Sequence, residues 1–186
     1  MWSKLSGWIL FRLLGWQVKG RYPYEVQKLV LIVAPHTSNW DFPIGILVRS
    51  ALRIDAHFVG KHTLFWGPFG PLMKWLRGIP VDRRGRHNFV DATAAIFSNK
   101  TYLHLVMAPE GTRSKVTRFK TGFYYIARQA GVPILLCTFD WSQKVIHFDP
   151  ELFWPGEDEQ SDMAKLWNYY KGVQGYNPQN GVGEAG

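Results

Sequence analysis

Residues 29–34 read LVLIVA, a continuous apolar run that passes directly into the polar sequence PHTSNWD at residues 35–41. The run is too short for a buried helix, whereas a strand covered on both faces of a parallel sheet has this pattern. Two other runs are of the same kind, YLHLVMA at 102–108 and VPILLCTF at 132–139. These three runs predict the central strands of a sheet.

Weaker patterns lie between these runs. Shorter strand candidates occur at 56–60, 79–82 and 145–148, and helical spacing occurs at 42–52, 64–76, 87–97, 119–130 and 162–171. Strands that alternate with helices predict an α/β fold, a single domain with a central mostly parallel sheet flanked by helices. We divide the 186 residues into an N-terminal helix at 1–20, the main domain at 21–172 and an irregular tail at 173–186.

Polar residues follow three of the predicted strands. His36 and Asp41 come after the first run, Arg83 and Arg84 follow residues 79–82, and the turn PEGTRS occupies residues 109–114. Ligands of open α/β sheets bind outside the carboxyl ends of the strands. We therefore expect these residues to converge on one edge of the sheet.

The spacing of His36 and Asp41 allows a carboxylate to orient an imidazole. The bonded ring nitrogen would be fixed, and the other could take a proton from a hydroxyl. No serine or cysteine obviously completes a triad, so the hydroxyl would come from the substrate and attack without an acyl-enzyme. By spacing alone, a structural interpretation is favoured, in which His36 bonds a backbone carbonyl and Asp41 is a charge at a helix N-terminus.

The other two turns could bind an anion. The guanidinium groups of Arg83 and Arg84 could hold a phosphate, although a solvated basic turn explains them equally well. Gly111 and Thr112 could donate to the same anion, Arg113 could neutralise it, and Glu110 could orient the arginines or a glycerol hydroxyl. The P-loop pattern is missing from this sequence, which argues against nucleoside triphosphate chemistry.

The charge of the chain is unevenly distributed. Residues 1–148 hold 20 Lys and Arg against 7 Asp and Glu, while residues 149–186 hold 2 against 7. A basic body attracts nucleic acid, an anionic membrane, or phosphorylated and acidic-carrier substrates. The sequence has no recognisable nucleic-acid-binding motif and no histidine or cysteine spacing typical of a metal site, so we expect neither partner. Cys137 is the single cysteine, which excludes an intrachain disulfide and favours a reducing compartment.

The first sixteen residues are rich in apolar side chains. Arg12 interrupts the apolar stretch, no signal-peptide cleavage site follows, and the stretch falls short of the ~18 apolar residues of a spanning helix. A helix here would align Trp2, Leu5, Ile9, Leu13 and Trp16 on one face. This pattern predicts a monotopic anchor at the membrane surface, with docking on the domain or on another subunit as the alternative. Residues 64–76 could likewise line an acyl groove, dip into lipid or pack on the sheet.

Taken together, the turns resemble the motifs of the glycerophospholipid acyltransferase family. Its histidine with an aspartate five residues later matches His36 and Asp41, with Ser38 between them. Its later motifs are similar to GIPVDR at 78–83, to EGTRS at 110–114 with Phe119, Lys120 and Gly122, and to VPI at 132–134. The four motifs occur in the order of the family and span roughly residues 30 to 140.

The resemblance implies a function and roles for these residues. His36 and Asp41 would be the catalytic dyad, and the acceptor would be bound by Lys61, Arg83, Arg84, Glu110, Gly111, Thr112, Arg113 and Lys120. The activity implied is acyl transfer from acyl-CoA or acyl carrier protein to a hydroxyl of a lysophospholipid such as 1-acylglycerol-3-phosphate, at the cytoplasmic face of the membrane. No metal or bound cofactor is implied.

The sequence departs from the family pattern beside the histidine. Pro35 stands where asparagine is usual, and Thr37 stands where glutamine is frequent. These differences affect the choice of acceptor more than the chemistry. The alternatives are a non-phosphorylated aminolipid or glycolipid precursor as acceptor, or a lipid-binding protein without catalytic activity.

Overall fold

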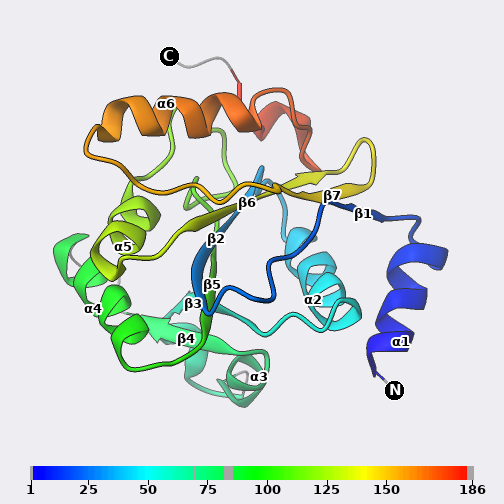
Figure 1. Cartoon of the computed structure of the whole chain (residues 1–186). Helices are drawn as coiled ribbons and strands as arrows, with labels where there is room; N and C mark the ends of the chain where they lie inside the picture. Colours follow the sequence, from blue (N-terminus) through cyan, green and yellow to red (C-terminus); the bar gives the residue numbers. More distant parts are fainter. Residues whose placement is uncertain (1, 69, 82–85, 184–186) are drawn as a thin grey trace.

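A seven-stranded sheet forms the centre of the protein, whose computed structural model describes residues 2–68, 70–81 and 86–183 (Figure 1). The strand order is β1-β7-β6-β2-β5-β3-β4. Neighbouring strands are parallel throughout, except that β7 runs antiparallel to β6. The strands are β1 (Gln17–Lys19), β2 (Lys28–Ala34), β3 (Ala56–Lys61), β4 (Gly78–Val81), β5 (Leu103–Met107), β6 (Ile134–Asp140) and β7 (Val145–Phe148). The predicted fold class is confirmed.

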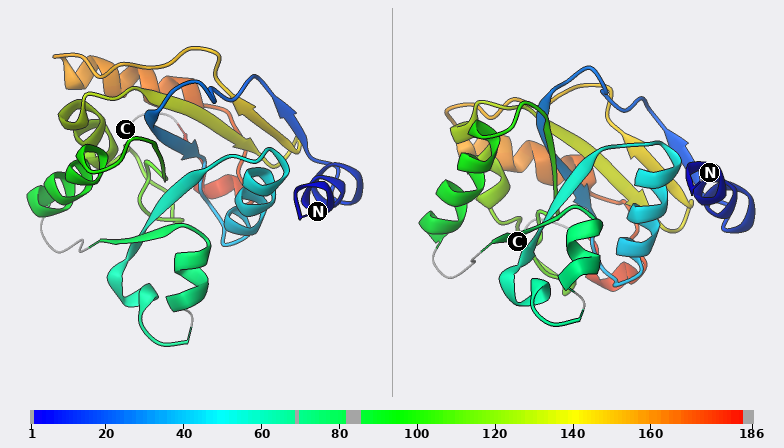
Figure 2. Two further views of the ribbon diagram at one scale, coloured as in Figure 1. Left: turned by 60° about the horizontal axis from the view of Figure 1, so that its bottom comes forward. Right: turned by 90° about the horizontal axis from the view of Figure 1, so that it is seen from below.

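Helices cover both faces of this sheet (Figures 1 and 2). Val30 and Ile32 of β2 point into one core, together with residues of α4 (Arg86–Ser98), α5 (Gly122–Ala130) and α6 (Glu159–Tyr170). Leu29 and Leu31 point into a second core, which includes Ile44 and Val48 of α2 (Asp41–Ala51). Because consecutive residues of β2 enter opposite cores, the run LVLIVA is apolar without alternation.

Strand β1 was not predicted from the sequence, because its three residues form no apolar run. It pairs in parallel with β7, with Val18 opposite Ile146, and two of its residues are exposed. Cys137, by contrast, is buried on β6 as expected of a residue in an apolar run, and burial raises the pKa of its thiol.

The single helix predicted at 64–76 is wrong. The structure has a 3-10 helix η2 (His62–Phe65) and then the short helix α3 (Gly70–Trp75). Gly67 adopts a φ of 73° between them, a conformation that glycine tolerates and that breaks a helix. Gly70 packs so closely that a Cβ there would lie 2.3 Å from the carbonyl oxygen of Phe65. Trp66 and Trp75 remain exposed around this break.

The N-terminal segment forms a helix, but one that ends before Trp16. It consists of α1 (Trp2–Gly7) and a π-helical continuation η1 (Trp8–Leu13), and Gly15 then turns the chain with a φ of 72°. Trp16 is therefore buried against the domain rather than aligned with the helix, which corrects that part of the prediction.

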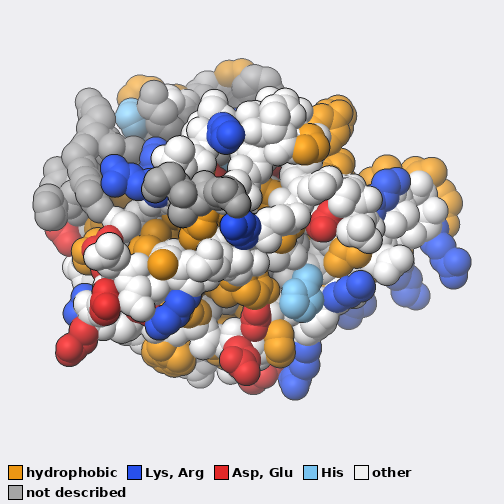
Figure 3. Space-filling view, turned by 90° about the horizontal axis from the view of Figure 1, so that it is seen from above, with side chains coloured by type: hydrophobic (Ala, Val, Ile, Leu, Met, Phe, Trp, Pro, Cys, Tyr) orange, Lys and Arg blue, Asp and Glu red, His pale blue; other side chains and the backbone are white. Residues whose placement is uncertain are grey.

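The helical segment both docks on the domain and exposes apolar surface. Leu10 is buried, and Ser6 donates a hydrogen bond to Ser50 of α2 over 2.8 Å. The segment also exposes five large apolar side chains: Trp2, Leu5, Trp8, Phe11 and Leu13. In Figure 3 this segment projects at the right, where hydrophobic side chains lie beside Lys and Arg. Within the described ranges, every helix is too short or too polar to cross a bilayer.

Candidate active site

His36 and Asp41 face each other across the turn between β2 and α2. The distance from His36 Nδ1 to Asp41 Oδ2 is 2.9 Å. Strand β2 ends two residues before His36, and helix α2 begins at Asp41, so the turn spans the carboxyl end of a central strand. The carboxylate is 5% exposed and the imidazole 22% exposed. The pair thus combines a buried anion with a ring that reaches the surface.

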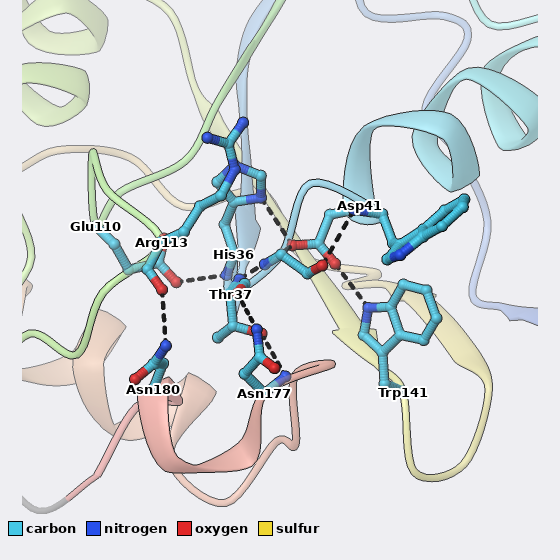
Figure 4. A network of polar contacts seen from close by, with 10 residues as sticks. His36, Thr37, Asp41, Glu110, Arg113, Trp141, Asn177 and Asn180 are labelled. Carbon is cyan, nitrogen blue, oxygen red and sulfur yellow. Dashed lines mark hydrogen bonds and ion pairs between the residues drawn. The ribbon is translucent and has the colours of Figure 1, made fainter.

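Three further donors hold the Asp41 carboxylate (Figure 4). Oδ2 accepts from the amides of Thr37 over 3.0 Å and Ser38 over 2.9 Å, and Oδ1 accepts from the indole N–H of Trp141 over 2.7 Å. Hydrogen bonds to a carboxylate favour its charged form. With its proton on Nδ1, the His36 ring donates this N–H to Asp41 Oδ2 and carries its lone pair on Nε2.

Glu110 supports the same turn from the loop that follows β5. Its Oε1 accepts the backbone N–H of His36 over 2.7 Å, and the residue is 2% exposed. Its Oε2 has no hydrogen-bond partner within the part of the chain that is described. Burial raises the pKa of the Glu110 carboxyl, while the His36 amide acts in the opposite direction. The structure places Glu110 beside the histidine turn, and its predicted contact with the substrate stays a prediction.

The following turn brings the other predicted binding residues to the same edge. Gly111 has a φ of 64°, and a Cβ there would lie 2.8 Å from Cδ of Lys120. The Lys120 side chain therefore crosses directly over this glycine. Thr112 Oγ1 accepts the amide N–H of Ser114 over 3.3 Å, while the Arg113 side chain is exposed.

Three of the predicted binding residues are not placed by the structure. Arg83 and Arg84 lie outside the described residues, as does the side chain of Lys61, whose backbone ends β3. Strands β3 and β4 run parallel to β5 and β2. The carboxyl ends of these strands therefore share the edge that carries His36 and Glu110.

The C-terminal segment, residues 172–183, makes a set of contacts to this site that no sequence pattern predicts. Asn177 donates its amide to Thr37 Oγ1 over 3.0 Å and its side-chain NH₂ to the Thr37 carbonyl over 2.7 Å. Asn180 donates to the carbonyl of Arg113 over 3.1 Å. Gly175 approaches so closely that a Cβ would lie 2.5 Å from Thr37 Oγ1. This segment thus ties the histidine turn to the Arg113 turn.

Comparison with known proteins identifies the family. The sequence model of the family described as Acyltransferase matches residues 16–139. The chain belongs to this acyltransferase family. The matched range includes His36, Asp41 and Glu110, and it ends before Trp141 and the C-terminal segment, so the motifs of the family do not reach these two supports of the site.

Several curated acyltransferases are similar to this chain. The 1-acyl-sn-glycerol-3-phosphate acyltransferase of Salmonella typhimurium is 32% identical over 142 residues, which are 72% of this chain and 57% of that protein. The protein of the same name from Haemophilus influenzae is 32% identical over 68% of this chain and 55% of its own length. The chain therefore spans less than two thirds of these relatives.

One solved structure shares the fold. The 1-acyl-sn-glycerophosphate (LPA) acyltransferase PlsC from Thermotoga maritima matches with a TM-score of 0.57 and 21% sequence identity, over 88% of this chain and 74% of that chain. The agreement covers most of the sheet and helices described above and supports the fold of this acyltransferase.

Proposed function

We propose that this protein transfers a fatty acyl group from acyl-CoA or acyl carrier protein to a hydroxyl of a lysophospholipid such as 1-acylglycerol-3-phosphate. The observation that carries the proposal is the state of the His36 ring. Its Nδ1 is bonded to buried Asp41, the ring reaches the surface, and its Nε2 makes no hydrogen bond to any residue that the structure describes. A ring held in this way is prepared to accept a proton from a substrate.

The chemistry then follows from the dyad. As the acceptor oxygen attacks the thioester carbon, its proton passes to His36 Nε2 and a C–O bond forms. The tetrahedral intermediate collapses with cleavage of the C–S bond, and the departing thiolate takes the proton back from His36. Asp41 stabilises the transient imidazolium, and general base catalysis of this kind contributes roughly 10²- to 10⁴-fold. The reaction needs neither an acyl-enzyme nor a metal or bound cofactor.

The exposed cations beside the dyad suit a phosphorylated acceptor. Arg113 and Lys120 lie on the turn that is joined to His36 through Glu110. Guanidinium and ammonium groups bind phosphate oxygens through charge-assisted hydrogen bonds. The names of the relatives from Salmonella and Haemophilus specify 1-acyl-sn-glycerol-3-phosphate, which is such an acceptor. We extend the same role to Lys61, Arg83 and Arg84.

We further propose that the N-terminal segment holds the protein on the cytoplasmic face of a membrane as a monotopic anchor. Trp2 is 75% exposed, Trp8 57% and Leu13 64%, and Lys4 and Arg12 are exposed on the same short segment. Tryptophan favours the bilayer interface, and cations favour anionic headgroups. The protein would then bind its lysolipid acceptor at the membrane, where the lipid resides.

The activity is tested by release of free thiol from acyl-CoA or acyl carrier protein in detergent, with a panel of phosphorylated and neutral lysolipids as acceptors. We expect release that depends on the acceptor and is fastest with 1-acylglycerol-3-phosphate. The rate should fall at least 100-fold in His36→Ala, as expected for loss of a general base. His147→Ala, a matched change on β7, should keep the wild-type rate.

Equal rates in wild type and His36→Ala would exclude the mechanism. A preference for neutral acceptors would retain the mechanism and replace the acceptor. Binding to lipid without acyl transfer to any acceptor would leave a lipid-binding protein. Membrane binding is tested separately by vesicle flotation, where Trp8→Ser should reduce recovery with anionic vesicles and Trp154→Ser, another exposed tryptophan, should not.

A further inference from the structure

The Asp41 carboxylate is held by two different kinds of contact. Its Oδ2 is bonded only within the turn, by His36 Nδ1 and the amides of Thr37 and Ser38. Its Oδ1 is bonded by Trp141, which follows Asp41 by 100 residues. In the described part of the chain, Trp141 is thus the one donor from outside the turn that reaches this carboxylate.

We propose that Trp141 is a positioning residue of the dyad, whose indole N–H fixes the Asp41 carboxylate and sets how strongly it holds the His36 imidazolium. The inference rests on the proposed function, because it concerns the base of that reaction. Trp141 touches the carboxylate and leaves the reacting ring nitrogen free (Figure 4).

The surroundings of Trp141 keep its indole in place. Trp16 packs edge-on against it with ring centroids 4.9 Å apart, and Tyr176 does the same from another side at 4.8 Å. The Trp141 amide also donates to the carbonyl of Gln174 over 2.8 Å. The end of the N-terminal segment and the C-terminal segment therefore both support one side chain, which in turn supports the catalytic carboxylate.

Tryptophan has the chemistry that this position requires. An indole N–H donates and cannot accept, and it does not titrate in the range where the dyad works. It therefore stabilises a charged Asp41 without competing for the proton that His36 must receive and return. A histidine here would compete for that proton, and a phenylalanine would leave Oδ1 without this donor.

The loss of this bond should change the reaction in a defined direction. Donation by the indole disperses the negative charge of Asp41, so its removal concentrates that charge on the histidine side. The protonated ring is then stabilised to a higher pH. At the same time the carboxylate loses its contact from outside the turn, and small misplacements of catalytic groups reduce rates strongly.

The experiment uses Trp141→Phe in the full chain, assayed by thiol release in detergent. We expect kcat to fall about 10-fold, KM for donor and acceptor to stay within about 2-fold, and the acid limb of the kcat profile to move up by about 0.5 pH unit. Trp167→Phe is the matched control, since Trp167 is buried and its indole donates to the Gly183 carbonyl over 3.1 Å, away from Asp41. It should leave kcat and the acid limb unchanged.

A second readout does not depend on activity. The ring protons of His36, assigned with His36→Gln, are followed by NMR as a function of pH in wild type and in both variants. An upward move of the titration midpoint in Trp141→Phe alone supports the proposal, even if no acceptor is found and the proposed function fails. An unchanged midpoint, or an equal move in Trp167→Phe, overturns it.

A second variant, Tyr176→Ala, tests the same proposal in case Trp141→Phe does not fold. Tyr176 is 47% exposed, so Tyr176→Ala removes one supporting ring from the surface. If Trp141→Phe does not fold, Tyr176→Ala decides the matter. It should move the His36 midpoint in the same direction by a smaller amount, and an unchanged midpoint would overturn the proposal.

Discussion

The two halves of the candidate site are built in opposite ways. The histidine turn, residues 35–41, is fixed by side chains from distant segments, and its Thr37, Ser38 and Asp41 are at most 8% exposed. The turn at residues 110–120 is exposed along most of its length, and its cations point outward. Catalytic groups gain from being held in place before the substrate arrives. On the proposed function, the fixed half would carry catalysis and the exposed half would bind the substrates.

The largest effect should come from the centre of the fixed half. Asp41→Asn keeps the shape of the side chain but removes the charge that stabilises the imidazolium, so kcat should fall by about 10²- to 10⁴-fold. Stopped assays of thiol release measure it. Asp162→Asn is the matched control, because Asp162 is also buried and hydrogen-bonded, to Tyr124 and the Gly156 amide. It should lower thermal stability and leave kcat per folded molecule intact. A wild-type kcat in Asp41→Asn would contradict the dyad.

The next effect should come from the contact between the C-terminal segment and the histidine turn. In Gly175→Ala the new Cβ would meet Thr37 Oγ1 at 2.5 Å and Cγ2 at 2.8 Å, so the turn must shift. Overpacking of this kind costs about 1 to 3 kcal/mol, and we expect kcat to fall about 10-fold with KM little changed. Gly183→Ala has open space around its Cβ and should behave as wild type. Equal kcat in both variants would mean that the segment is a passive cover.

A change in the exposed half should affect substrate binding, measured as KM, and not kcat. Arg113→Ala should raise KM for a phosphorylated acceptor about 10-fold and KM for a neutral acceptor by less than about 2-fold, because one charge-assisted contact is lost. We expect the same of Arg83→Ala. Arg128→Ala, an exposed residue of α5, removes the same charge at a distance and should change neither KM. Equal increases with both acceptors would remove phosphate recognition from Arg113.

The smallest effect concerns the pH dependence of stability through Glu110. Burial raises the pKa of its carboxyl, so the folded state favours the protonated form. The contribution of Glu110 to stability is therefore greatest below its unfolded pKa and falls as pH rises through the folded pKa. Glu110→Gln keeps an oxygen for the His36 amide but does not titrate. The Tm of this variant relative to wild type should rise between pH 4.5 and 7.5, and the exposed-residue control Glu157→Gln should show no such trend.

The sequence predicted the parts of this site that depend on local pattern. The apolar run at 29–34 marked β2, and the spacing of His36 and Asp41 placed both on one turn, so that the dyad geometry followed from residues close in the chain. The supports did not follow, because Trp141 and Asn177 reach the turn across 100 and 140 residues. Tertiary contacts of this range leave no periodic signal, and the Gly- and Asn-rich end gave no sign of its partners.

The same limit explains the two errors in the helices. At 64–76 the apolar spacing continued through Gly67, whose positive φ breaks the helix. At the N-terminus the pattern extended to Trp16, but Gly15 turns the chain and Trp16 packs against Trp141 instead. In both places a glycine decided the boundary, and its conformation depends on contacts that the pattern does not contain.

The contact between Asn177 and Thr37 also sets an order of events during protein synthesis. All strands of the sheet have been synthesised once Phe148, the last residue of β7, is added. Asn177, which bonds Thr37 of the histidine turn, is synthesised later. A ribosome adds about 5 to 20 residues per second, and folding proceeds as the chain emerges. A nascent chain can therefore form its sheet seconds before the contact between Asn177 and Thr37 is made.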